Sequence, residues 1–143
     1  MVKVNTLTFK QMNKTVLMID DDPFALFINQ EIIQPLIIPS PKTYFQAKEA
    51  LKFLKENHSE DMQILIFLDL NMPEMNGWEF LDEIDKSDLK KNIFVVIITS
   101  SIDQRDYKKA QQYPNVSDFV VKPINQQLIK NLVQNQQIST FFK

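Results

Sequence analysis

Apolar runs alternate along this chain with stretches whose apolar residues have helical spacing, and this alternation constrains the fold more than any other feature. The runs cover residues 15–20 (TVLMID), 41–45 (PKTYF), 64–69 (ILIFLD), 93–100 (IFVVIITS) and 118–121 (DFVV). The stretches after them predict helices over residues 22–33, 47–54, 77–85, 103–113 and 125–138. Five strand–helix units of this kind predict an α/β fold, a doubly wound, five-stranded parallel sheet with helices on both faces.

The spacing also predicts which helix faces are buried. In the first helix Phe24, Phe27, Ile28 and Ile32 fall on one face, and in the second Ala47, Ala50, Leu51 and Leu54 form an amphipathic stripe. The run at 41–45 follows Pro35, Pro39 and Pro41. Proline cannot donate to a strand ladder, so this run is expected at the edge of the sheet.

One domain accounts for the whole length. A chain of 143 residues with no break in composition suits a single domain, which we assign to residues 14–143. Residues 1–13 fit no strand pattern. Residues 1–11 precede a second methionine, Met12, which is an alternative start of translation. We interpret them as an N-terminal extension, either disordered or foreign to the native protein.

Charge and composition exclude several classes of partner and site. The net charge is −2 and the lysines are scattered, so neither nucleic acid nor an anionic membrane is an expected partner. The chain has no cysteine, which removes disulfides, thiolate zinc sites and cysteine nucleophiles. No segment has the apolar length of a signal peptide core or a membrane span, and we expect a cytoplasmic protein.

Polar residues follow the predicted strands at the places where they end. They are Asp20, Asp21 and Asp22 after the first strand, Asp69 at the end of the third, Thr99, Ser100 and Ser101 at the end of the fourth, and Lys122 after the fifth. In parallel sheets the carboxyl ends of the strands meet at one edge, where ligands bind. The sequence therefore predicts that these side chains share a site.

The acids of this site need a positive partner. Two carboxylates ~4 Å apart repel each other by about 4 kcal/mol at an effective dielectric constant of ~20. Mg²⁺ (or Mn²⁺) with oxygen ligands from Asp20 and Asp21 meets that need, and Lys122 supplies a second positive charge. Asp69 is then the natural nucleophile for a phosphoryl group, with Thr99 able to hold its oxygens. We assign Asp22, which precedes Pro23, to capping the first helix.

Four fragments carry a resemblance to a known family. VLMIDDDP, IFLDLNMPEMNGWEF, VVIITSS and DFVVKP occur in this order. Over Lys14 to Ile138 the chain resembles the receiver domain of two-component response regulators, in its stand-alone, chemotaxis-regulator-like form. The resemblance implies the flavodoxin-like strand order 2-1-3-4-5 and a phosphorylation switch that catalyses only its own phosphorylation and dephosphorylation.

The resemblance also implies a role for each matching residue. Asp69 would accept a phosphoryl group from a phosphohistidine of a sensor histidine kinase or a histidine phosphotransfer protein. Asp20 and Asp21, with Asp69 and the backbone carbonyl of Asn71, would bind the metal. Thr99 and Phe119 match the switch pair and Lys122 the ion-pairing lysine. The peptide bond before Pro123 is expected to be cis. Asn71 and Ser101 match the positions that tune the loss of the phosphoryl group.

Gly77, the single glycine of the chain, follows the loop that leaves the third predicted strand. A turn at this place needs either a positive φ or a close approach of backbone, and glycine permits both. We expect a structural role for it in holding the loop that contains Asn71.

Several functions stay open at this point. With no output domain after the fifth helix, the chain is expected either to bind an unknown downstream protein through a switched surface or to relay the phosphoryl group. An aspartyl-phosphate phosphohydrolase is the enzyme alternative, but that class needs an aspartate where this chain has Asn71. A flavin-binding domain is disfavoured because the acids after the first strand repel phosphate. A scaffold receiver that is never phosphorylated is the last alternative.

Overall fold

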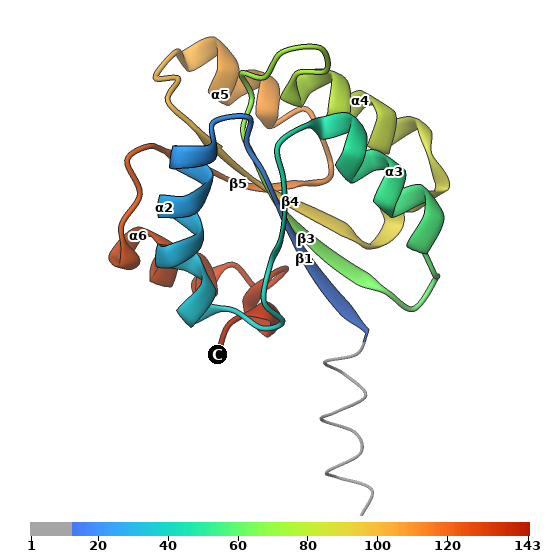
Figure 1. The fold of residues 1–143 in the computed structure, drawn as a ribbon, viewed down its shortest axis with the longest axis horizontal. Helices are drawn as coiled ribbons and strands as arrows, with labels where there is room; N and C mark the ends of the chain where they lie inside the picture. The colour runs from blue at the N-terminus through green and yellow to red at the C-terminus, as the bar shows by residue number, and fades with distance from the viewer. Residues whose placement is uncertain (1–12) are drawn as a thin grey trace, which may run out of the picture.

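In a computed structural model, of which residues 13–143 are described, the protein folds around one five-stranded parallel sheet (Figure 1). Its strands lie in the order β2-β1-β3-β4-β5, which confirms the predicted topology. Their bounds are β1 Lys14–Ile19, β2 Lys42–Tyr44, β3 Gln63–Leu68, β4 Ile93–Thr99 and β5 Val116–Val121. The three-residue strand β2 lies at the sheet edge, as the prolines before it predict.

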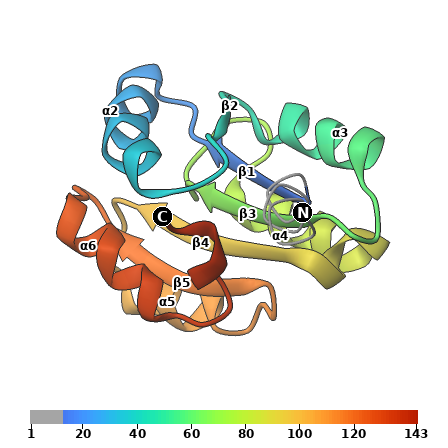
Figure 2. The ribbon, with the colours of Figure 1, turned by 90° about the horizontal axis from the view of Figure 1, so that it is seen from below.

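Helices cover both faces of the sheet (Figures 1 and 2). Their bounds are α2 Pro23–Ile33, α3 Ala47–Asn57, α4 Gly77–Lys86, α5 Gln104–Ala110 and α6 Gln126–Asn131. Side chains of α2 and α6 share one buried cluster with the sheet, and those of α3, α4 and α5 share the other. The chain is therefore wound in both directions from β1, which brings the carboxyl ends of β1 and β3 together at the centre of one edge.

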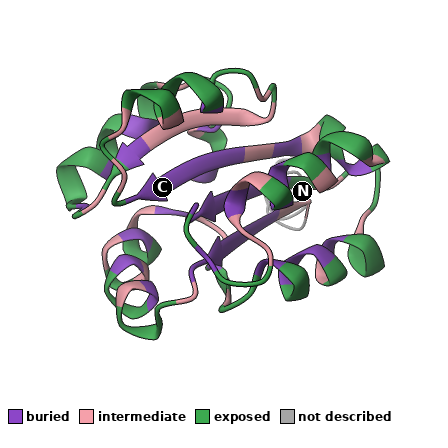
Figure 3. Cartoon of the chain, turned by 90° about the horizontal axis from the view of Figure 1, so that it is seen from above, coloured by how far each residue is buried: buried purple, intermediate pink, exposed green. Residues whose placement is uncertain are grey.

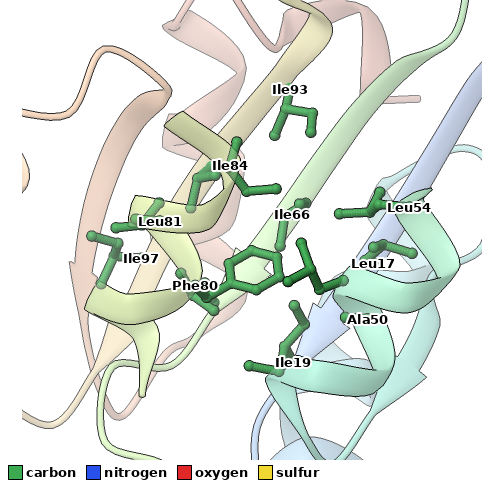
Figure 4. Packing of buried hydrophobic residues seen from close by; sticks show 14 of the residues in the cluster. Leu17, Ile19, Ala50, Leu54, Ile66, Phe80, Leu81, Ile84, Ile93 and Ile97 are labelled. Carbon is green, nitrogen blue, oxygen red and sulfur yellow. The ribbon is translucent and has the colours of Figure 1, made fainter. Parts of the chain in front are cut away.

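The two clusters form the core. Figure 3 shows that the buried residues lie mainly along the strands, while the helices carry many exposed residues. Strands β3 and β4 are buried along most of their length because helices lie on both of their faces. Figure 4 shows the cluster on the α3–α4 side, where the Phe80 ring of α4 lies beside Ile66 of β3, and Leu54 of α3 joins the same cluster. The predicted stripe of α3, which includes Ala50, is buried as expected.

Helix α2 turns a different face to the core from the one that the spacing of its apolar residues suggested. The structure buries Leu26, Asn29 and Ile33, whereas Phe24, Phe27 and Ile28 are exposed. The prediction was wrong for these three residues, because the helix has more apolar residues than one face can hold, whereas Ile32 is half-buried against the core as expected. Its entry is fixed by Asp22, which caps the helix as predicted by accepting a hydrogen bond from the Phe24 amide at 3.0 Å.

The last helix is shorter than the 125–138 that the sequence pattern predicted. Helix α6 ends at Asn131, and short 3₁₀ turns follow at Leu132–Gln134 and Ser139–Phe141. The Asn135 side chain donates to the Ser117 carbonyl and accepts from the Gln137 amide, so it offers the backbone an alternative to the helix. The segment beyond it closes the core, with Phe141 fully buried.

Residues 1–12, most of the expected N-terminal extension, lie outside the described residues. Strand β1 begins at Lys14, and the division of the chain into an extension over residues 1–13 and a domain over residues 14–143 stays a prediction. Among residues 13–143, the helices are too short or too polar for any of them to cross a membrane.

Candidate functional site

Backbone hydrogen bonds hold the strand ends of the site in register. The Asp20 amide donates to the Tyr44 carbonyl at 3.1 Å, which joins the end of β1 to β2. The Asp69 amide donates to the Ile19 carbonyl at 3.0 Å and joins β3 to β1. Because these strands are parallel neighbours, the loops that follow them start side by side at one sheet edge.

Three predicted acids converge at this edge. Asp20, Asp21 and Asp69 each offer a carboxylate oxygen, and the three oxygens lie within 4.8 Å of one another. Asp20 and Asp69 are buried, with 4% and 7% of their surface exposed. A hydrogen bond from the backbone fixes the Asp20 carboxylate, since the Asp22 amide donates to Asp20 Oδ1 at 3.0 Å.

Lys122 reaches the acids from the end of β5. Its amide donates to the Thr99 carbonyl at 2.8 Å, which sets the position of the residue beside β4. The Lys122 Nζ lies 2.8 Å from Asp20 Oδ2 and 3.8 Å from Asp69 Oδ2. The peptide bond between Lys122 and Pro123 is cis, as expected; a second cis bond, before Pro39, was not predicted. One fixed cation thus faces two buried carboxylates.

The surroundings of Asp69 disfavour its charged form, which shows in a raised pKa. Burial, followed by the nearby Asp20 carboxylate, raises the pKa of Asp69 from 3.8 to about 6. The Lys122 ammonium and the backbone N–H groups of Asn71 and Leu70 act in the opposite direction. At neutral pH the group is therefore largely an anion, but a poorly solvated one that gains from a positive ligand.

The side chains present fit a small divalent cation. The cluster consists of hard oxygen donors, the ligands that Mg²⁺ prefers, and the Lys122 ammonium offsets only one of the three carboxylate charges. Asp20, Asp21 and Asp69 would hold such an ion. Asn71 lies two residues beyond Asp69, and the assignment of its backbone carbonyl as a further ligand stays a prediction.

The loop between Asp69 and α4 depends on close packing at Gly77. The Gly77 amide donates to the Leu70 carbonyl at 2.9 Å. A Cβ at Gly77 would lie 2.7 Å from the Asp69 carbonyl oxygen and 2.8 Å from the Leu70 Cα. Of the two predicted reasons for a glycine, close approach of backbone is therefore the one that applies. The positive φ occurs instead at Glu74, with a value of 64°.

The two residues of the predicted switch lie on neighbouring strands. Thr99 is fully buried at the end of β4, and its Oγ1 accepts a hydrogen bond from the Ser101 amide at 3.2 Å. Phe119 in β5 is half-buried and packs edge-on against Tyr107 of α5, with ring centroids 5.6 Å apart. Phe119 thus lines a surface beside α5 rather than the acid pocket.

Asn29 is a residue of this region that the sequence analysis missed. It lines a small cavity together with Asp20 and Asp69, from the buried face of α2. A signal was available, because Asn29 lies three residues after Leu26 and four before Ile33, which are both apolar. The apolar residues that the structure shows to be exposed led us to predict another buried face of α2, and Asn29 does not lie on that face.

We expect Lys122→Met to destabilise the metal-free protein by about 2–4 kcal/mol, because it leaves two buried carboxylates without their cation. Added Mg²⁺ should restore a large part of the loss. Denaturant unfolding with and without Mg²⁺ measures both effects. Lys52→Met is the matched control, since Lys52 is exposed and its ion pair with Glu56 is 3.9 Å long, so we expect less than about 1 kcal/mol. Equal losses for the two variants would contradict the prediction.

Comparison with known proteins identifies what the chain is similar to. The profile of the response regulator receiver domain matches residues 16–134. The probable methanogenesis regulatory protein FilR2 of Methanothrix harundinacea is 31% identical over 90 residues, which are 61% of this chain and 57% of that protein. The two-component response regulator ORR22 of Oryza sativa subsp. indica is 28% identical over 120 residues, which are 84% of this chain but only 16% of that protein.

A solved structure agrees with these matches. The two-component response regulator from Cytophaga hutchinsonii is 28% identical to this chain and superposes with a TM-score of 0.70, covering 88% of this chain and 97% of that one.

Proposed function

The chain belongs to the response regulator receiver domain family, and from this premise we propose that Asp69 accepts a phosphoryl group from a phosphohistidine of a sensor histidine kinase or histidine phosphotransfer protein. The observation that carries the proposal is the convergence of three carboxylates with one lysine ammonium at the sheet edge. That arrangement combines a nucleophile, the donors for a divalent cation and a fixed positive charge within one pocket.

The transfer itself needs little from the protein beyond position and charge. An Asp69 carboxylate oxygen attacks the phosphorus, the phosphorus–nitrogen bond of the phosphohistidine breaks, and the imidazole leaves with the electron pair. Lys122, already 3.8 Å from Asp69 Oδ2, can turn its ammonium to a phosphoryl oxygen. A cation held by Asp20, Asp21 and Asp69 would supply further charge neutralisation when bound.

The surroundings of the pocket support a protein as the phosphoryl donor. Helix α2 begins directly after the acids, and Phe24, Phe27 and Ile28 are exposed along it. A donor that brings a histidine to Asp69 must cover the rim of the pocket, and these apolar side chains would gain from being covered.

We propose that the output is a change in the surface around α5 and β5. The Thr99 hydroxyl now accepts from the Ser101 amide, and its own proton is free to turn towards a phosphoryl oxygen on Asp69. Phe119 and the exposed Ile102, Tyr107 and Val121 line one shallow pocket on this side. A shift of Thr99 would change the space next to Phe119, so phosphorylation would favour one arrangement of this apolar surface and bias the binding of a downstream protein.

Incubation with Mg²⁺ and a small-molecule phosphodonor tests the function directly. We expect the intact mass to rise by one phosphoryl group and the product to be cleaved by hydroxylamine, which attacks acyl phosphates. Chelation of Mg²⁺ should prevent the reaction. A protein that gains no phosphoryl group under these conditions, and does not respond to beryllium fluoride with Mg²⁺, would be the scaffold alternative.

A further inference from the structure

The buried face of α2 presents one polar side chain to the core, that of Asn29. Only 7% of its surface is exposed, and its neighbours on that face, Leu26 and Ile33, are apolar. Among the described residues, every fully buried side-chain nitrogen or oxygen has a hydrogen-bond partner, and no hydrogen bond joins the Asn29 carboxamide to another described residue, so its polar atoms are not sealed from solvent. An apolar residue would match Leu26 and Ile33 on this face, so packing alone does not explain an asparagine here.

The place of Asn29 in the structure gives its amide a use. A cavity of about 10 Å³ lies between α2 and the sheet, and Asn29, Asp20 and Asp69 all line it. The remaining wall is apolar, with contributions from Met18, Phe67 and Ile98. The volume is close to the minimum that one water molecule needs, and two carboxylates with one amide supply the two to four polar partners that hold such a water.

From this juxtaposition we propose that Asn29 is a positioning residue of the acid pocket: its carboxamide holds one water in the cavity, and this water hydrogen-bonds the carboxylates of Asp20 and Asp69 from the side of α2. The same two carboxylates also contact Lys122 and, with Asp21, form the group that would hold a cation. A hydrogen bond from the cavity would fix the orientation in which their oxygens meet the ion. The inference rests on the proposed function, because it concerns the ion that the same pocket binds.

The test is the affinity of the whole chain for Mg²⁺, measured by calorimetric titration on variants of residue 29. Asn29→Leu fills the cavity with apolar atoms and should weaken Mg²⁺ binding about tenfold, the range found when groups that orient metal ligands are removed. The same variant should be at least as stable as the parent in metal-free buffer, because leucine matches the apolar residues Leu26 and Ile33 on the same buried face. Opposite changes in affinity and stability are not expected from a merely structural residue.

Two further variants keep the inference open to refutation. Asn29→Ser retains a polar group and room for water. Its Mg²⁺ affinity should fall between the affinity of Asn29→Leu and that of the parent. Ile33→Val alters the same buried face of α2 away from the cavity and should leave the affinity unchanged. If Asn29→Leu does not fold, the other two variants still test the inference. The inference then requires that Asn29→Ser binds Mg²⁺ more weakly than the parent, while Ile33→Val binds it as the parent does.

The outcomes separate this inference from the function on which it rests. If the parent binds Mg²⁺ and Asn29→Leu binds it equally well, the role of Asn29 is overturned and the proposed function stands. If the parent binds no Mg²⁺ and gains no phosphoryl group, both are overturned.

Discussion

Asp69→Asn is expected to abolish phosphoryl incorporation, to below about 1% of the parent, because an amide oxygen is not a nucleophile for phosphorus under these conditions. Intact-mass measurement after incubation with Mg²⁺ and a small phosphodonor gives the result. Asp85→Asn is the matched control, since Asp85 is an exposed acid of α4 and should leave incorporation unchanged. An Asp69→Asn protein that is phosphorylated like the parent would refute Asp69 as the acceptor.

The same substitution should stabilise the metal-free protein near neutral pH. The pKa of Asp69 is raised from 3.8 to about 6, so between these pH values the folded protein binds more protons than the unfolded chain. The free energy of unfolding of the parent therefore falls as the pH rises from about 4 to 6, and the penalty is complete above that range.

Asp69→Asn removes this penalty because the asparagine does not titrate. We expect a gain of about 1–2 kcal/mol at pH 7, less than the full pKa difference implies because water reaches the mouth of the pocket. The charges that face Asp69 are those of Asp20, Asp21 and Lys122, and all three remain in the variant. Denaturant unfolding at pH 4 and pH 7 without metal measures the effect, and an equal pH dependence in parent and variant would contradict it.

Gly77→Ala should destabilise the protein by about 2–4 kcal/mol, although alanine is the better helix former at the first residue of α4. The added Cβ would lie 2.7 Å from the Asp69 carbonyl oxygen and 2.8 Å from the Leu70 Cα. Both atoms belong to the backbone, so no side-chain rotation relieves the contact, and the loop that begins at Asp69 must move. We therefore expect Mg²⁺ affinity to fall together with stability.

A graded series separates this contact from a general effect of helix propensity. Gly77→Val adds two methyl groups to the alanine Cβ and should cost more than Gly77→Ala, by denaturant unfolding and by loss of Mg²⁺ affinity. Propensity alone predicts the opposite sign for alanine, a gain of up to about 1 kcal/mol over glycine. An alanine variant as stable as the parent would show that the loop between β3 and α4 adjusts without cost.

Most of the site could be predicted because its residues are tied to the ends of strands. A strand ends where an apolar run ends, and parallel strands bring their carboxyl ends to one edge, so Asp20, Asp69 and Lys122 could be grouped without coordinates. Which of the two carboxylates Lys122 pairs with could not be predicted from the sequence. Lys122 lies closer to Asp20 than to Asp69, a difference of 1 Å that depends on the loop after β5 and on side-chain packing.

The wrong predictions concern helices α2 and α6, whose sequence patterns are compatible with more than one buried face or more than one end. Helix α2 has apolar residues on several sides, and only contact with the sheet selects Leu26, Asn29 and Ile33 as the buried face. Helix α6 ends at Asn131, and beyond it the Asn135 side chain bonds the carbonyl of Ser117, a residue that is distant along the chain. Asn29 was missed for the first of these reasons, although it lies beside two of the predicted acids.

The sequence by itself determined the order and type of the elements, the topology through its family resemblance, and the residues at the strand ends, because these follow from local periodicity and chain connection. Only the tertiary structure decided the buried face of α2, the end of α6, the reason for Gly77 and the partner of Lys122. Each of these depends on which atoms from distant parts of the chain come within a few ångströms of one another, and local periodicity contains no information about such contacts.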